Sequence, residues 1–200
     1  MNWKLILFVA LISYGGYQHF SNRPIVHGNG VVASQQPSQS TIKQNVSQQQ
    51  GFNHNGYHIT PLEDFAIEAR VLATKDYTFG READLAPVDL ALGWGAMSDE
   101  AVLKDIKISQ SNRFYYWRVD EFPIPRKEIE TQSANMHMIP ADSQVEKTLK
   151  SVRPGQVVKL TGYLIEAKAD DGWRWKSSLT REDTGANACE LIFVKSLSVH

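Results

Sequence analysis

The sequence predicts an α+β protein that is mainly antiparallel β, namely a small OB-like or related β-barrel with short inserted helices. An N-terminal apolar helix and a disordered tether are expected to precede this barrel. Three observations point to the class. Residues 65–71 and 113–119 alternate between the two faces of a strand. An Asp-Gly turn at 171–172 joins two strand-like segments, and Gly162 stands in mid-strand, where a small barrel must bend.

The first 20 residues have the pattern of a signal-anchor or a signal peptide. A lysine at position 4 precedes an apolar run over 5–12, which is shorter than the ~20 residues that cross a bilayer. No small-x-small cleavage site follows closely, and Trp3 and Tyr17 suit the membrane interface. We therefore expect residues 3–17 to anchor the chain in the inner membrane as a single pass, with the C-terminal domain in the periplasm. Secretion to the periplasm after signal cleavage is the alternative.

Residues 21–56 are rich in Gln, Ser, Asn and Gly and carry few bulky apolar side chains. Such a composition buries too little surface to offset the entropy of ordering, so a disordered tether is expected here. The remaining residues, 57–200, are expected to form the barrel domain.

The overall composition excludes several classes of function. A net charge of −1 gives no electrostatic footprint for nucleic acid, so no nucleic-acid partner is expected. One cysteine excludes an internal disulfide, and no Cys/His cluster has the spacing of zinc ligands. We accordingly expect no cofactor and no metal.

The first part of the domain predicts one strand and two short helical turns. In the strand over 65–71, apolar side chains share one face, and Glu68 and Arg70 share the other. Pro87 is expected to open a short helical turn with Asp89 near its N-terminus. Ser98 and Asp99 are expected to cap a short helix that ends near residue 105.

The aromatic segment that follows predicts a second strand with aromatic residues on both faces, which suggests a strand that is covered on both sides or curled into a barrel. Its two faces are Arg113, Tyr115, Trp117 and Val119 on one side and Phe114, Tyr116 and Arg118 on the other. Prolines then limit any helix to about 126–132.

The C-terminal third gives the clearest pattern. Asp142 is expected to cap a helix whose Val145, Leu149 and Val152 form one apolar stripe. A hairpin with its turn at 170–172 and a final strand over 190–199 follow, which brings the total to about five strands.

The motif "DTGA" at 183–186 resembles the catalytic loop of an aspartic protease, but polar residues precede it and no supporting glycine follows. A loop between two strands is therefore the better interpretation. A second enzymatic hypothesis is a periplasmic hydrolase that pairs His137 with Cys189, with Asn135 as the orienting group, or that uses Asp183 as an acid–base. Cys189 also falls on the core-facing side of the final strand, which favours a structural role.

The segments "RFYYWR" and "WRWK" interleave aromatic and basic residues, a pattern that can stack bases or sugar faces. Trp173, Trp175 and Ser177 share one face of the second segment. Packing within the sheet is the more common role of such tryptophans, and an extracytoplasmic address favours a glycan or a peptide over nucleic acid.

The stretches "DLALGWGAMSD", "SANMHMIPAD" and "DGWRWKSSLTREDTGA" resemble a group of uncharacterised bacterial periplasmic or membrane-anchored proteins. The likeness covers most of the chain after residue 57 and implies that these loops act together, but it brings no known activity. We expect their polar and aromatic residues to gather near one end of the barrel and to line a pocket or a buried network. These residues are Trp94, Ser98, Asn135, His137, Trp175, Ser178, Arg181 and Asp183.

The function that follows is a membrane-anchored periplasmic module that binds or assembles with an envelope protein, a peptide or a glycan. The hydrolase that uses His137 with Cys189 or Asp183 is the alternative, and a purely structural subunit of an envelope complex is a third class.

Overall fold

The computed structural model describes residues 3–10, 23–42, 51–180 and 189–200. Its strands are β1 (Ser38–Thr41), β2 (Phe52–His54), β3 (Tyr57–Asp76), β4 (Val88–Gly93), β5 (Ile106–Ser111), β6 (Phe114–Val119), β7 (Ser133–Pro140), β8 (Val157–Lys168), β9 (Arg174–Lys176) and β10 (Glu190–Val199). Its helices in the domain are α3 (Arg81–Leu85), the 3-10 helix η1 (Gly95–Ser98), α4 (Glu100–Leu103), α5 (Arg126–Thr131) and α6 (Ser143–Leu149). Residues 3–10 are helical, and no helix in the described part of the chain has the length and apolar character needed to cross a membrane.

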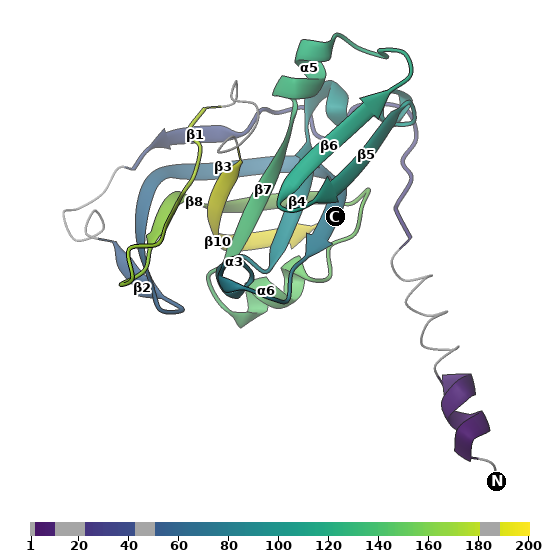
Figure 1. The fold of residues 1–200 in the computed structure, drawn as a ribbon. Helices are drawn as coiled ribbons and strands as arrows, with labels where there is room; N and C mark the ends of the chain where they lie inside the picture. The colour runs from purple at the N-terminus through teal and green to yellow at the C-terminus, as the bar shows by residue number, and fades with distance from the viewer. Residues whose placement is uncertain (1–2, 11–22, 43–50, 181–188) are drawn as a thin grey trace.

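The predicted fold class is confirmed at the level of a mainly antiparallel β protein with few, short helices (Figure 1). The main sheet has the order β1-β3-β4-β7-β10-β8-β9, and β2 pairs with β3 outside this path. Among the described strands only β7 and β10 run parallel, and β5 and β6 form a separate antiparallel hairpin.

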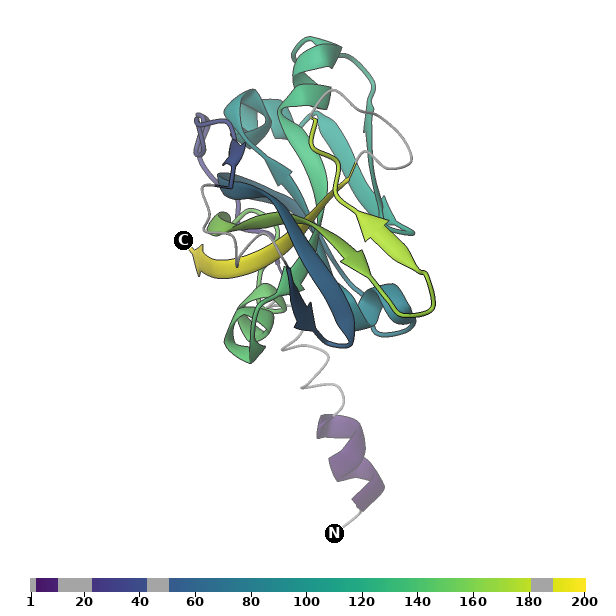
Figure 2. The same ribbon diagram turned by 90° about the vertical axis from the view of Figure 1, so that its left-hand side faces the viewer.

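The long strand β3 takes part in two different pairings. Its first part, His58–Arg70, pairs with β8, and its last part, Arg70–Asp76, pairs with β4. The pairing therefore passes from β3 through β4, β7, β10 and β8 and returns to β3. The curvature of β3 that this requires is visible in Figure 2. Gly162 lies in β8 between Phe65 of β3 and Val194 of β10, next to a register shift in β10.

The main hydrophobic core is built from alternate residues of β3, β4, β7, β8 and β10. α6 closes one side of it with Val145, Leu149 and the following Val152, so the predicted apolar stripe is buried as expected. The Asp142 side chain accepts hydrogen bonds from the backbone N–H groups of Gln144 and Val145, which confirms it as the helix cap.

Two expectations for the first part of the domain are wrong. Residues around Asp89 form the strand β4 and not a helical turn, because sheet neighbours bury every residue of Val88–Gly93 and override local helix signals. Arg70 was expected on a solvent face, yet it is 5% exposed, because it pairs with Glu100 of α4 and donates to the Ser98 carbonyl at 3.3 Å.

The alternation of the aromatic strand is confirmed, but its predicted covering on both sides is wrong. Exposed and half-buried residues alternate along β6, with Phe114, Tyr116 and Arg118 exposed. The reason is the partner strand β5, which the sequence analysis missed. The hairpin lays its inner face, with Trp117 and Val119, over a small cluster around Met97 and leaves its outer face to solvent.

The segment expected as a tether contributes residues that lie on the domain. The N–H of Ile25 donates to the Pro154 carbonyl at 2.9 Å, and Ala33 is 2% exposed. β1 then pairs with residues 63–66 of β3. These contacts use backbone groups and one small side chain, so a polar composition does not prevent them.

Gly162→Ala is expected to lower the free energy of unfolding, by about 1–3 kcal/mol in chemical denaturation. The cause is steric, because a Cβ at this position would lie 2.0 Å from the Phe193 carbonyl oxygen of the neighbouring strand. Gly28→Ala is the matched control, since a Cβ there meets nothing within 4 Å. Equal stability of the two variants would contradict the close packing of β8 against β10.

Candidate functional site

The Asp89 carboxylate lies on the face of β4 that points away from the main core. Its neighbours Val88 and Leu90 point into that core, and Asp89 itself is 0% exposed. A buried carboxylate is costly unless it is paired and hydrogen-bonded, so its partners define the local structure.

Two cationic or ionisable side chains meet the same oxygen of Asp89. Arg113 Nη1 donates to Oδ1 at 2.7 Å, and His137 Nδ1 lies 2.9 Å from Oδ1. Asp89 and His137 are direct register partners across β4 and β7, which places both on one face of the sheet. All three side chains are largely buried, so the pairing is shielded from solvent.

Arg113 comes from the turn of the β5–β6 hairpin and holds a left-handed backbone conformation at φ 68°. Asn112 before it has φ 50°, so the two residues occupy the turn positions where Asn-Gly is favoured. An arginine pays a conformational cost at the second position, where glycine does not. That cost is offset by its side-chain contacts, which include the Ala86 carbonyl at 2.8 Å and Glu82 at 3.7 Å.

Asn135 connects the hairpin to the sheet. It lies two residues before His137 on β7, and its Nδ2 donates to the Arg113 carbonyl at 3.0 Å and approaches Asp89 Oδ2 at 3.5 Å. Gln110 of β5 donates to Asn135 Oδ1 at 2.6 Å. We call Asp89, Arg113, Asn135, His137 and Gln110 the buried polar network.

Aromatic rings enclose this network. The Trp175 ring lies 4.8 Å from the His137 ring, and the Arg113 guanidinium lies 3.6 Å from the centre of the Tyr77 ring and 5.7 Å from that of Trp175. The Tyr77 hydroxyl also accepts from the Arg113 N–H at 3.0 Å. Burial raises the pKa of Tyr77, so its hydroxyl stays neutral as this contact requires.

Cys189 lies at the edge of the network with its Sγ 3.9 Å from the Arg113 carbonyl oxygen. Burial, and next the Glu190 carboxylate, raise the pKa of the Cys189 thiol to about 11. A nucleophilic cysteine needs a lowered pKa, so this thiol is protonated at neutral pH. His137 directs Nδ1 to Asp89 rather than to Cys189.

The structure brings together three of the predicted site residues, Asn135, His137 and Trp175. Trp94 and Ser98 lie beyond the opposite end of β4. Trp94 is buried in the main core, and Ser98 Oγ bonds the backbone of Ala33 and Gly95.

The remaining predicted site residues lie beyond the masked loop or near its ends. Ser178 is 8% exposed and holds a turn through Thr180 and the Cys189 carbonyl. Arg181 and Asp183, and with them the "DTGA" motif, lie outside the described residues.

Sequence reasoning missed Asp89, Arg113, Gln110 and Tyr77 as members of the site. Asp89 carried a usable signal, since it is the one acidic residue within the apolar stretch "LAPVDLALGWGAM" and an acid in such a stretch must be paired. Arg113 after Asn112 was a second signal, because a turn dipeptide that avoids glycine often keeps its side chain for a purpose.

The arrangement can orient an imidazole but does not assemble a metal centre. With Nδ1–H directed to Asp89, a neutral His137 presents Nε2 as an acceptor. Within residues 3–10, 23–42, 51–180 and 189–200, no group of three or more His, Cys, Asp or Glu side chains could hold a metal ion.

No protein-family model, no curated protein and no solved structure matches this chain. The reading of the site therefore rests on its own geometry.

Arg113→Met is expected to destabilise the domain by about 3–5 kcal/mol, because it leaves the Asp89 carboxylate buried without its cation. Arg118→Met is the matched control on the exposed face of the same strand and should change stability by less than about 0.5 kcal/mol. Urea denaturation of both variants tests this. A loss in Arg113→Met no larger than that of the control would contradict the structural weight given to the ion pair.

Cys189 is expected to react slowly with iodoacetamide at neutral pH. A pKa of about 11 leaves only about one thiolate in ten thousand at pH 7, so the rate should rise steeply as the pH is raised toward 11. His137→Gln should leave this rate unchanged. Fast labelling of the folded protein at neutral pH, lost in His137→Gln, would instead support the hydrolase.

Proposed function

We propose that this chain is a membrane-anchored assembly module of the bacterial envelope, which binds another envelope protein through the outer face of the β5–β6 hairpin. Residues 3–17 would anchor it as a single pass in the inner membrane, and the domain would lie in the periplasm. The length and flanking residues of the apolar run support this location, and secretion after signal cleavage remains the alternative.

We infer that the strand circuit is a small OB-like barrel. β3 would be its first strand, shared between β4 and β8, and β7 and β10 its parallel pair. The sequence places three strands after the helix at 143–149, where an OB-fold has two. That mismatch is removed if β9, a three-residue strand paired only at the end of β8, is an addition to the barrel.

The observation that carries the binding role is the exposed aromatic stripe on β6. Phe114 is 37% exposed and Tyr116 is 50% exposed, with their ring centres 6.4 Å apart. Arg118 continues the same face. Phenylalanine, tyrosine and arginine are the residues that protein interfaces favour, and exposed aromatic patches mark such interfaces.

The neighbouring loop extends this surface. The hairpin turn contacts Tyr77, and two residues further along the chain Phe79 is 93% exposed. A side chain so exposed contributes almost nothing to the domain's own core. We interpret Phe79, Phe114 and Tyr116 as one contact surface for a partner protein.

The buried polar network supports binding by holding the hairpin rigid beneath this surface. Arg113, which immediately precedes Phe114, is fixed by Asp89 and by the aromatic rings around it. A pre-ordered surface loses less conformational entropy on association than a flexible one.

The hydrolase that uses His137 keeps one observation in its favour, the Asp89–His137 pair, which has the geometry of a base and its orienting carboxylate. It lacks an activated nucleophile, because Cys189 is protonated and bonded to a backbone carbonyl. The variant that uses Asp183 concerns a residue outside the described part of the chain.

Replacement of Tyr116 by a photo-crosslinking phenylalanine analogue in the membrane-anchored protein is expected to give one crosslinked envelope protein. Phe114→Ala in the same chain should reduce that product about tenfold or more, as expected for the loss of an aromatic hot spot. The same analogue at Lys176, exposed on β9, is the control and should not give this product.

The result also separates the other ligand classes. Absence of a protein product, together with retention on purified cell-wall glycan that is lost in Phe114→Ala, would replace the protein partner by a glycan. An equal product from position 176 would contradict the hairpin as the contact surface.

A further inference from the structure

The segment before the domain is bound at a site shaped to receive it. Gly155, between α6 and β8, has φ 90°, and a Cβ there would lie 1.9 Å from the Ile25 carbonyl oxygen. Its N–H donates to the Val71 carbonyl at 2.7 Å, and its own carbonyl lies 2.5 Å from His27 Nε2. Any residue other than glycine would therefore push Ile25 away.

Three further contacts continue this attachment along the chain. The Gly30 N–H donates to Asp99 Oδ1 at 2.8 Å, and the Ala33 carbonyl accepts from the Gly95 N–H at 2.8 Å. Ala33 also bonds Ser98 Oγ at 3.1 Å through its N–H. We call residues 23–33 the strap, and the surface beneath its first part the strap face.

The strap shortens the link between the predicted anchor and the domain. Only eight residues separate Tyr17 from Ile25, and eight residues span at most about 29 Å. If the chain were free up to residue 57, the link could extend to about 140 Å. A domain of this size has a radius of gyration of about 15 Å and so a diameter near 40 Å, which exceeds the shorter link.

We propose that the strap holds the strap face against the phospholipid bilayer, so that the domain has a fixed orientation on the membrane. This rests on the membrane anchor proposed above. A link shorter than the domain's diameter does not allow the domain to turn its opposite side to the membrane.

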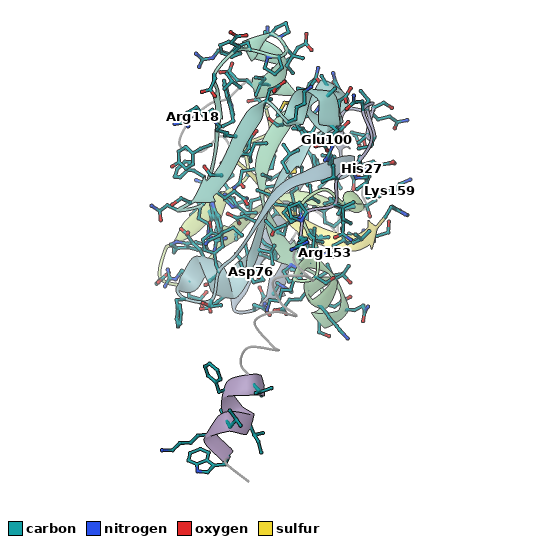
Figure 3. All side chains as sticks on the ribbon, turned by 90° about the vertical axis from the view of Figure 1, so that its right-hand side faces the viewer. His27, Asp76, Glu100, Arg118, Arg153 and Lys159 are labelled. Carbon is teal, nitrogen blue, oxygen red and sulfur yellow. The ribbon has the colours of Figure 1, made fainter. Side chains whose placement is uncertain are left out.

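The composition of the strap face is compatible with lipid headgroups. Figure 3 shows His27, Arg153 and Lys159 on this side of the molecule, together with Asp76 and Glu100. Glu100 is paired with Arg70. Val26, between the two strap residues that contact Gly155, is 76% exposed and can reach the apolar boundary of the headgroup layer.

The strand β8 provides a ruler for the test. It begins at the strap face, and Lys159 and Lys168 are exposed lysines near its two ends. Nine residues of strand separate them by about 30 Å. In a Cys189→Ser background, Lys159→Cys and Lys168→Cys would each carry a donor fluorophore. The full chain would be reconstituted in phosphatidylcholine–phosphatidylglycerol vesicles that contain an acceptor-labelled lipid.

Energy transfer to the lipid is expected to be several-fold greater from position 159 than from position 168. Gly155→Ala, and separately His27→Ala, should bring the two positions close to equal transfer. Gly80→Ala is the matched control, because Gly80 has φ 93° with nothing within 4 Å of its Cβ position, so it shares the backbone cost without a strap contact. It should keep the difference.

Equal transfer from both positions in membrane-bound protein with an intact strap would overturn the fixed orientation while leaving the anchor in place. A chain that does not co-sediment with vesicles in any variant would overturn the anchor, and the orientation with it. His27→Ala leaves Gly155 intact, so a folding defect of Gly155→Ala does not prevent the test.

Discussion

The burial of one carboxylate, that of Asp89, is the constraint on which the candidate site depends. The strand that carries it is buried along its whole length, so the charge is not relieved by solvent. It requires a cation, and Arg113 supplies it from a hairpin turn that tolerates arginine only at a conformational cost. Closing the hairpin over β7 is therefore coupled to neutralising Asp89, and the exposed face of β6 takes its position from that closure.

Much of the fold was accessible from the sequence because the relevant signals are local. Alternation along β6, the Asp142 cap and the final strand each depend on residues within one element. The site was less accessible, since Asp89 meets partners 24 and 48 positions away. A strand pairing must be known before such contacts can be foreseen, and the local pattern around Asp89 indicated a helical turn, so Asp89 was placed on the wrong element.

The strap illustrates a different limit of composition. A segment rich in Gln, Ser and Gly has few apolar side chains to bury, which correctly indicates that it forms no core of its own. It does not indicate whether another part of the chain offers backbone donors and acceptors. Here Pro154 and Gly155 do so, and the absence of a side chain on Gly155 is what makes room for Ile25. The information lies in the receiving surface and not in the segment itself.

The polar network and the aromatic stripe divide stability and binding between the two faces of one hairpin. The inner face spends its polar groups on each other, with Asp89, His137 and Asn135 each engaged inside the domain. Groups so engaged are poorly placed to take part in turnover, because a reaction would have to break bonds that hold the hairpin down. The outer face has aromatic side chains that the fold does not use. A surface that costs the domain nothing to present, on an element that the interior holds rigid, is better suited to recognition than to catalysis.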